Sequence, residues 1–242
     1  MAIEFDAASS LQQIDPPVTS VTFAFSTTGS NRLLLVGVLQ VATGSDVVSS
    51  VTYNGVALTR INTVTFLNGN RRNNLYYLLA PATGSNNCVV TLSSGIDNSR
   101  IHAFSYTGVR QSDQPDASNT NSHEMPYTST TIANVSVTTV AANCRIMGFG
   151  GSMSGGFTVD VNTTKDGGGT AYWCVSRAVT TAGAYTIGGT QNSSNWAVCA
   201  ASFAPALPDN GGFFFRFMSI AAPTVGLAAA SSYLSWLTNV SI

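Results

Sequence analysis

The chain has 242 residues, of which 9% are charged, whereas about 25% of the residues in a typical soluble domain carry a charge. Ten basic and eleven acidic residues give a net charge of -1, and no basic stripe is present, which excludes a nucleic-acid surface held by phosphate neutralisation. Such weak charge favours a protein that works within an assembly. The length fits one large β domain or two small ones.

The N-terminal residues predict synthesis and folding in a cytoplasm. Residues 1–10 contain neither a basic n-region nor an apolar h-region, so we expect no secretory signal. The four cysteines occur in apolar, strand-like contexts without CxxC spacing, and we expect them to be buried free thiols. They are Cys88, Cys144, Cys174 and Cys199.

Apolar and β-branched residues alternate in short runs along the chain as far as residue 205. Gly, Asn, Asp and Ser clusters separate these runs, a pattern typical of a β-sandwich or β-barrel. The expected strands cover residues 2–7, 20–27, 31–42, 47–54, 56–66, 73–80, 87–93, 100–108, 132–140, 144–152, 157–164, 170–179, 184–189 and 196–205.

Turn signals support this interpretation. Asn54-Gly55 between two alternating runs predicts a type I′ hairpin, and residues 67–70 and 165–169 predict similar turns. Residues 110–131 show no apolar periodicity, so we expect a long surface connection there, as in Greek-key and jelly-roll topologies.

Pro205 and Pro208, followed by two glycines, predict the end of the last strand and a domain boundary. We expect a sandwich over residues 1–206 and an apolar C-terminal arm over residues 207–242. Within this arm the pattern predicts a short strand and then a helix from about Pro223, which suits a first turn. The expected assembly contacts of the arm are Phe213, Phe214, Phe215, Phe217, Leu227, Leu234, Trp236 and Leu237.

The arm allows three interpretations. Residues 217–240 form an uncharged run of membrane-spanning length, but scattered Ser, Thr and Asn residues and the lack of a closely following basic residue disfavour a membrane helix. Packing onto its own sandwich stays open. Docking on a neighbouring subunit is favoured, because an apolar arm adds interface area, and it predicts a homo-oligomer.

Titratable residues give no convincing catalytic pattern, and we predict no catalytic residue, metal or cofactor. His102 alternates within a strand and is expected to be packed or on the surface, whereas His123 lacks HExxH spacing. A glycosidase pair and a Ca²⁺ site near residues 112–119 are minor alternatives. We expect these carboxylates to be solvated in loops: Asp113, Asp116, Glu124, Asp160 and Asp166.

Aromatic residues are candidates for stacking on sugar rings. Tyr76 and Tyr77 are consecutive, as are Tyr172 and Trp173, so one ring of each pair should face solvent in a strand. The possible glycan contacts are Tyr77, Tyr172, Trp173 and Trp196.

Several segments carry a resemblance to a known group. They are SVTYNGVALTRI, NLYYLLAPATGSNNCVVTLS, FSYTGVRQSDQPDASNTNS, TTVAANC and ASFAPA. At these segments the sequence resembles jelly-roll-like β-sandwich domains of phage virion structural proteins and uncharacterised bacterial surface proteins. The resemblance covers residues 1–206 and implies the fold, but it offers no catalytic motif to map, and the arm falls outside it.

Together these observations predict an all-β, jelly-roll-like antiparallel β-sandwich with a short apolar C-terminal arm. The expected function is that of a non-enzymatic virion structural protein, a capsid decoration or tail-associated subunit whose partners are copies of itself and other virion proteins. The alternative is a carbohydrate-binding adhesion module at the bacterial cell surface.

Overall fold

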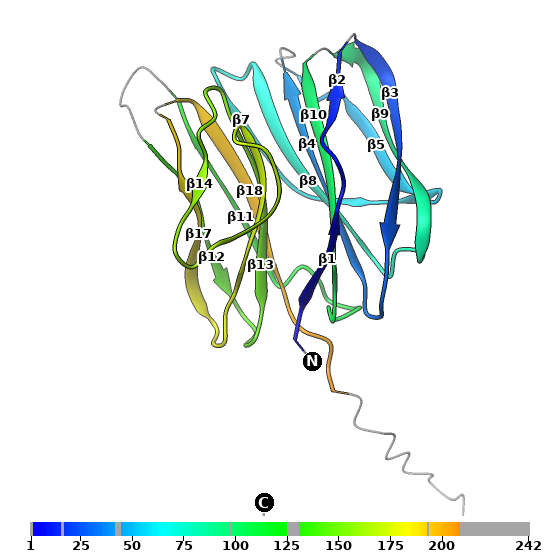
Figure 1. Cartoon of the computed structure of the whole chain (residues 1–242), viewed down its shortest axis with the longest axis vertical. Helices are drawn as coiled ribbons and strands as arrows, with labels where there is room; N and C mark the ends of the chain where they lie inside the picture. The colour runs from blue at the N-terminus through cyan, green and yellow to red at the C-terminus, as the bar shows by residue number, and fades with distance from the viewer. Residues whose placement is uncertain are drawn as a thin grey trace, which may run out of the picture. The chain divides into compact units, whose positions relative to one another are not determined.

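A computed structural model describes residues 2–15, 17–41, 45–96, 98–124, 131–192 and 194–208. Within these residues the regular secondary structure is entirely β, and every strand pair is antiparallel (Figure 1), which confirms the predicted all-β class. The predicted arm lies outside the described residues from residue 209 onward, so its strand, its helix and its contact residues stay predictions.

The N-terminal half of the described chain forms two sheets. The first inner sheet has the strand order β1-β10-β4-β8-β7, with β2 also paired to β10. Its strands are β1 (Glu4–Ala8), β2 (Gln12–Ile14), β4 (Leu33–Val41), β7 (Thr59–Phe66), β8 (Arg71–Leu79) and β10 (Ser99–Thr107). The first outer sheet has the order β3-β9-β5-β6, from β3 (Val18–Thr27), β5 (Val48–Tyr53), β6 (Val56–Ala57) and β9 (Gly84–Ile96).

The C-terminal half forms two more sheets. The second inner sheet has the order β11-β18-β13-β16-β15, from β11 (Ala117–His123), β13 (Arg145–Ser152), β15 (Thr164–Gly168), β16 (Tyr172–Ala178) and β18 (Trp196–Phe203). The second outer sheet has the order β12-β17-β14, from β12 (Ile132–Thr139), β14 (Thr158–Val159) and β17 (Gly183–Thr190).

The four sheets stack face to face as outer, inner, inner and outer layers (Figure 1). Three apolar cores fill the spaces between them. The core of the first half includes Phe25, Val90 and Val36; the central core joins Leu35 and Phe104 to Phe149 and Phe203; the core of the second half includes Val135, Ile187 and Trp173. The two halves are therefore joined through a mostly apolar core between their inner sheets.

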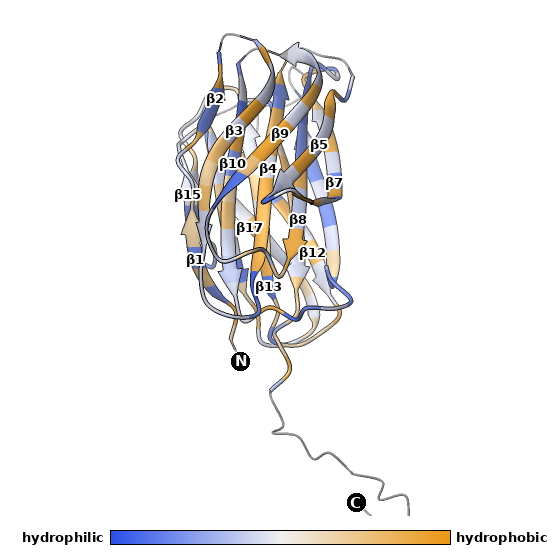
Figure 2. Cartoon of the chain, turned by 90° about the vertical axis from the view of Figure 1, so that its right-hand side faces the viewer, coloured by the Kyte–Doolittle hydropathy of each residue, from blue (hydrophilic) through white to orange (hydrophobic). Residues whose placement is uncertain are grey.

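The strand sequences follow from this layering. β4 is buried along nearly its whole length and β18 along all of it, because both faces of an inner sheet are covered. Their sequences are correspondingly apolar except for Gln40 and Ser202. Figure 2 shows this as orange along β4. In the outer sheets, β12 and most of β3 alternate between exposed and buried residues, as expected where one face meets water.

The second half repeats the pairing scheme of the first. Leu33 of β4 is paired with Leu79 and Tyr106, and Arg145 of β13 is paired with Ala178 and Phe203 in the same positions.

Local irregularities recur as well. The pairing of β7 with β8 shifts register between Arg60 and Asn62, and that of β15 with β16 shifts between Lys165 and Gly167. The residues Asn31 and Asn143, which lie shortly before β4 and β13, have positive φ angles of 52° and 57°. The described chain is thus a tandem duplication of one sandwich, a division that the sequence had not revealed.

The structure confirms the predicted turns at residues 54–55 and 67–70 and corrects the predictions for two other segments. Asn54 and Gly55 have φ angles of 49° and 77°, as a type I′ hairpin requires. The expected surface connection over residues 110–131 contains β11, and the expected turn over residues 165–169 is largely β15. Both segments form strands because an inner sheet supplies a pairing partner, although neither has apolar alternation.

Candidate functional site

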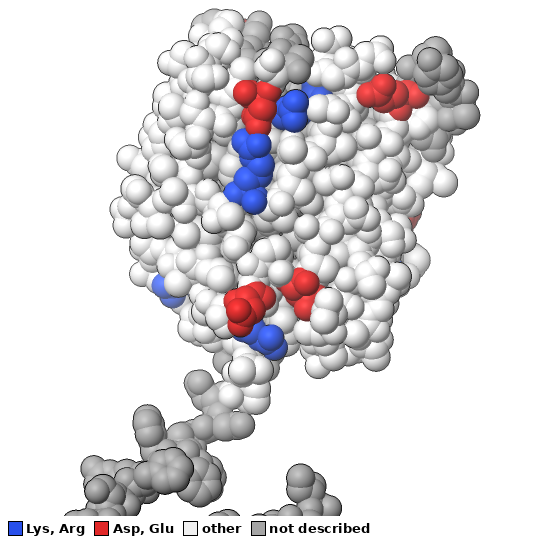
Figure 3. Space-filling model, turned by 180° about the vertical axis from the view of Figure 1, so that it is seen from behind, with Lys and Arg blue, Asp and Glu red and all other residues white. Residues whose placement is uncertain are grey.

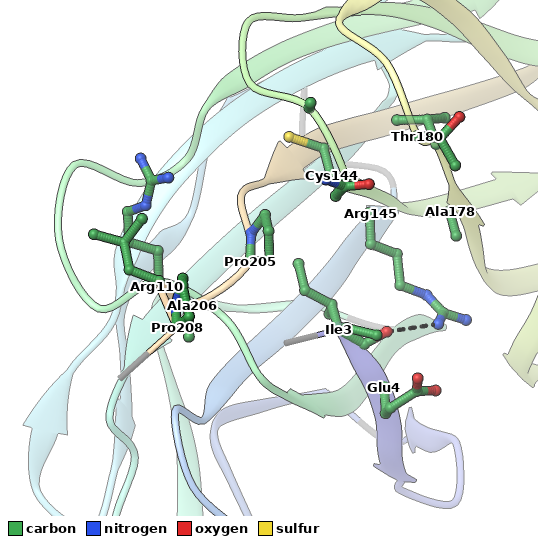
Figure 4. A pocket seen from close by; sticks show the side chains of 15 residues that line it. Ile3, Glu4, Arg110, Cys144, Arg145, Ala178, Thr180, Pro205, Ala206 and Pro208 are labelled. Atoms are coloured by element: carbon green, nitrogen blue, oxygen red, sulfur yellow. Dashed lines mark hydrogen bonds between the residues drawn. The ribbon is translucent and has the colours of Figure 1, made fainter. Parts of the chain in front are cut away.

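A cavity of about 760 Å³ opens at one end of the stack, where the N-terminal residues begin β1 (Figure 4). Its wall is formed by segments that are distant in sequence. They are residues 2–4, Arg110, residues 142–145, residues 178–180 and residues 205–208.

Backbone contacts hold these segments together. The Val109 N–H donates to Asn31 O at 2.9 Å, and the Ala206 N–H donates to Gly108 O at 2.7 Å. Val109 also forms an isolated bridge with Pro205. The polypeptide leaving β18 is therefore fixed to the end of the first inner sheet, and Pro208, the last described residue, lies on the cavity wall.

Arg145 is the central polar residue of this wall. Its Nη1 donates to Ile3 O at 3.0 Å, the bond drawn in Figure 4, and its Nε and Nη2 donate to Ser176 Oγ at 3.0 Å. Nη2 is also 4.0 Å from Asp166 Oδ1. Arg145 thereby ties the N-terminal segment to the second inner sheet.

Behind the wall, Tyr106 and Asp166 connect the two halves. The Tyr106 hydroxyl donates to Asp166 Oδ2 at 2.5 Å, and the Arg145 guanidinium carbon is 5.5 Å from the centre of the Tyr106 ring. Burial raises the pKa of Tyr106 well above its usual value, and the nearby Asp166 carboxylate raises it further. The phenol therefore stays protonated and acts as a donor across the interface.

The remaining lining is mostly small and apolar. Cys144 is buried, its Sγ donates to Ala141 O at 3.2 Å, and burial raises the pKa of its thiol to about 12. A protonated thiol of this kind is a poor nucleophile. The arrangement suits the burial of apolar side chains at the end of the sandwich.

The four candidate glycan contacts are not gathered on one surface. Trp173 is 0% exposed and stacks on Phe157 at 4.0 Å, and Trp196 is 4% exposed, so neither indole offers a face to a sugar in this structure. Tyr77 is partly buried, and its hydroxyl donates to Gln114 O at 2.8 Å. Tyr172 is partly buried beneath Arg100, whose guanidinium carbon is 5.1 Å from the ring centre.

The carboxylates expected to be solvated behave differently from one another. Asp113 is exposed, as predicted, and Glu124 accepts a hydrogen bond from the Asn68 N–H at 3.2 Å. Asp166 is 2% exposed at its side chain, which corrects the prediction, because β15 turns it into the interface between the halves. Asp116 accepts hydrogen bonds from the N–H groups of Val140 and Ala141. Asp166 is followed by three glycines, and nothing in this local sequence indicated that its side chain would be buried.

His102 and the cysteines follow the predictions that were made for them. His102 is buried, and its Nδ1 is 3.0 Å from Ser9 Oγ. His123 stacks on Trp196, with ring centres 6.3 Å apart. All four cysteines are free and buried, as predicted.

Charged side chains occur in a few small groups separated by wide uncharged areas (Figure 3). One such group contains Arg60 and Asp46, whose Nη1 and Oδ2 atoms are 2.5 Å apart. In the described residues no three His, Cys, Asp or Glu side chains are arranged to hold a metal ion. The same part of the chain contains no helix long and apolar enough to cross a bilayer.

No family model matches this chain, and no curated protein and no solved structure matches it either.

Proposed function

We propose that this chain is a non-enzymatic structural protein of a virion, a capsid decoration or tail-associated subunit that assembles through its apolar C-terminal arm. The observation that carries the proposal is the position of the cavity. Residues 205–208, which lead into the arm and include its first two residues, lie on the wall of an open and mostly apolar cavity at one end of the stack.

Two further features support a structural role. The chain doubles one sandwich and joins the copies through an apolar core, which builds a rigid block from a small unit. Its charge is low, and a protein with little self-repulsion tolerates the close packing of many copies.

We also propose that each half is a jelly-roll-like sandwich, in agreement with the resemblance described above. The strand order supports this, because β1 and β10, the first and last strands of the first half, lie side by side in the order β1-β10-β4-β8. The facing sheet has the order β3-β9-β5-β6, and β11 and β18 repeat the relationship in the second half. Such pairing of first and last strands is a property of double Greek-key sandwiches.

Substitutions within the arm test the proposed assembly. The full chain should form oligomers in sedimentation velocity, and changing Phe213, Phe215 and Phe217 to Ser should shift them towards monomers, because apolar interface area is lost. Changing Ser231, Ser232 and Ser235 to Ala is a control that removes no apolar area. If the Phe variant associates as the unchanged chain does, the arm is not the assembly element.

A second candidate function is glycan binding, for which one other surface is favourable. A groove of about 460 Å³ on the first outer sheet is lined by Thr52, Asn54, Gly55, Ser85, Asn86, Asn87 and Val89. Hydroxyl and amide groups of this kind hydrogen-bond to sugar hydroxyls. Selective signals on a glycan array that disappear with Asn87→Ala would favour this function, whereas a pure scaffold gives no selective signal.

A further inference from the structure

The strand β3 forms one edge of the first outer sheet, which Figure 2 shows from its exposed side. The equivalent edge in the second half is β12. The two edges differ in whether side chains occupy their outward-pointing backbone carbonyl groups.

The β12 edge is closed by side chains. Asn119 and Asn121 of the neighbouring β11 donate through their Nδ2 atoms to Ser136 O and Asn134 O, each at 2.8 Å. These two carbonyl groups therefore point away from β17, the strand with which β12 is paired. An edge whose carbonyls are occupied in this way is a poor template for another strand.

The shared register identifies the corresponding atoms of β3. Asn134 and Ser136 are paired with Gly188 and Thr186, and the same positions in the first half are Thr22, paired with Val89, and Ala24, paired with Asn87. The N–H and C=O groups of Thr22 and Ala24 thus point away from β9.

No side chain of the described residues closes this part of the β3 edge. The residues equivalent to Asn119 and Asn121 are Ser9 and Gln12. Ser9 follows Ala8 in the pairing of β1 with β10, and Gln12 of β2 is paired with Ile101, the counterpart of Val198. The Ser9 hydroxyl accepts the Ala103 N–H and contacts His102 instead, and the Gln12 Nε2 donates to Ser10 O at 3.1 Å. Asp6 caps the edge further along, where it accepts the Thr28 N–H at 3.0 Å.

The chemistry of β3 favours pairing with another strand. Its sequence VTSVTFAFST contains no charge and no proline, the usual protections of an exposed edge. Thr22, Ala24 and Ser26 are exposed, short and uncharged, so two copies of this edge meet without repulsion or steric conflict. Val21 and Ala7 lie at the margin of the adjacent core and are only partly buried, so a second copy could cover their exposed apolar surface.

We propose that β3 pairs antiparallel with β3 of a second copy, so that two first outer sheets form one continuous sheet across a two-fold axis. The register irregularity between Val18 and Ser20 restricts regular pairing to the remainder of the strand. Pairing centred on Phe23 runs over residues 20–26 and sets Thr22 opposite Ala24 of the second copy. This contact is independent of the arm, and it gives the symmetric, self-complementary interface of a dimer.

Replacing Ala24 by proline tests whether backbone hydrogen bonds of β3 join the two copies. The Ala24 N–H points outward, so proline removes a bond to the second copy while leaving the pairing of β3 with β9 in place. Sedimentation velocity of the full chain should show a dimerisation step that weakens at least tenfold in Ala24→Pro and in Ala24→Lys. Ser136→Lys, at the equivalent position of the closed edge, is the matched control and should dimerise normally.

Cross-linking tests the register. In the proposed pairing the two Thr22 residues lie about 8 Å apart, from the spacing between strands and the rise along them. Thr22→Cys should therefore give a covalent dimer with a short bis-maleimide, whereas Asn134→Cys should not, and the four native thiols are buried.

Two results would overturn the proposal. One is a full chain that remains monomeric over the whole concentration range. The other is association that is unchanged by Ala24→Pro and gives no Thr22→Cys cross-link, which would assign assembly to another surface such as the arm. Circular dichroism and urea unfolding of each variant identify any loss of association that comes from misfolding.

Discussion

Asp6 and Asp116 share two corresponding hydrogen bonds in the two halves of the chain. Asp6 Oδ2 accepts the Thr28 N–H at 3.0 Å and the Ser105 hydroxyl at 2.8 Å, and the Thr28 hydroxyl also donates to this carboxylate. Asp116 Oδ2 accepts the Val140 N–H at 2.8 Å and the Ser202 hydroxyl at 3.0 Å. Each carboxylate fastens the end of an outer edge strand to the last strand of its own inner sheet.

Replacing either aspartate by alanine should lower the free energy of unfolding by about 1–2 kcal/mol, because charge-assisted hydrogen bonds from three donors are lost. The two losses should add in the double variant, since the carboxylates share no partner. Urea unfolding monitored by tryptophan fluorescence measures this, with the exposed Asp113→Asn as a control that should stay within about 0.5 kcal/mol. Equal stability of Asp6→Ala and the unchanged chain would contradict the assigned role.

The bond between Tyr106 and Asp166 should contribute to the attachment of the two halves. Tyr106→Phe should cost about 1.5–3 kcal/mol, because it removes a buried donor to a carboxylate. A double-mutant cycle with Asp166→Asn measures the coupling between the two side chains in urea unfolding. Coupling near zero would mean that the 2.5 Å contact is not energetically significant.

Gly37 should be intolerant of any side chain. A Cβ atom at this position would lie 2.2 Å from Cγ of Phe149 in the opposing inner sheet, so Gly37→Ala forces the two sheets apart. We expect a loss of about 1–3 kcal/mol or more, the usual range for overpacking of a well-packed core. Gly169→Ala, where a Cβ would meet nothing within 4 Å, is the control. A stable Gly37→Ala variant would show that the central core is loosely packed.

Stability should fall in mild acid because of His102. Burial lowers the pKa of His102, and its Nε2 has no hydrogen-bond partner among the described residues. In the unfolded chain this imidazole binds a proton near pH 6.5, whereas in the folded chain it stays neutral at that pH. The free energy of unfolding should therefore be highest above about pH 6.5. It should decrease as the pH falls from there to the lower pKa of the folded state. The slope should not exceed about 1.4 kcal/mol per pH unit for one proton.

Urea unfolding between pH 5 and pH 7.5 measures this slope, and His102→Gln should reduce it. A variant whose pH dependence matches that of the unchanged chain would show that other groups cause the acid sensitivity.

The sequence predicted those parts of the fold that depend on short-range patterns, such as alternation of apolar residues or turn-forming pairs. Alternation located most strands, and the Asn54-Gly55 pair located a hairpin. The nearly continuous apolar run in β4 also reflects its environment, because a strand covered on both faces needs no polar side.

Features that depend on a distant partner were not predictable in this way. Residues 117–123 are polar, yet they pair with β18 along their length. Asp166 is buried because Tyr106 and Arg145 reach it from other strands, and Trp173 is enclosed by the second outer sheet. The duplication could not be recognised in the sequence, because the two halves share their strand pairing and not their side chains. Leu33 and Arg145, for example, occupy equivalent positions but differ in chemistry.

The apolar core between the inner sheets also determines how the chain comes apart. Each inner sheet has two faces that must be kept from water, and one of them is covered only by the other half. Loss of one sandwich would expose a whole apolar layer of its twin, so we expect neither copy to keep its fold alone. Heating should give one calorimetric transition for residues 2–208, and a protease should find no stable half-length fragment.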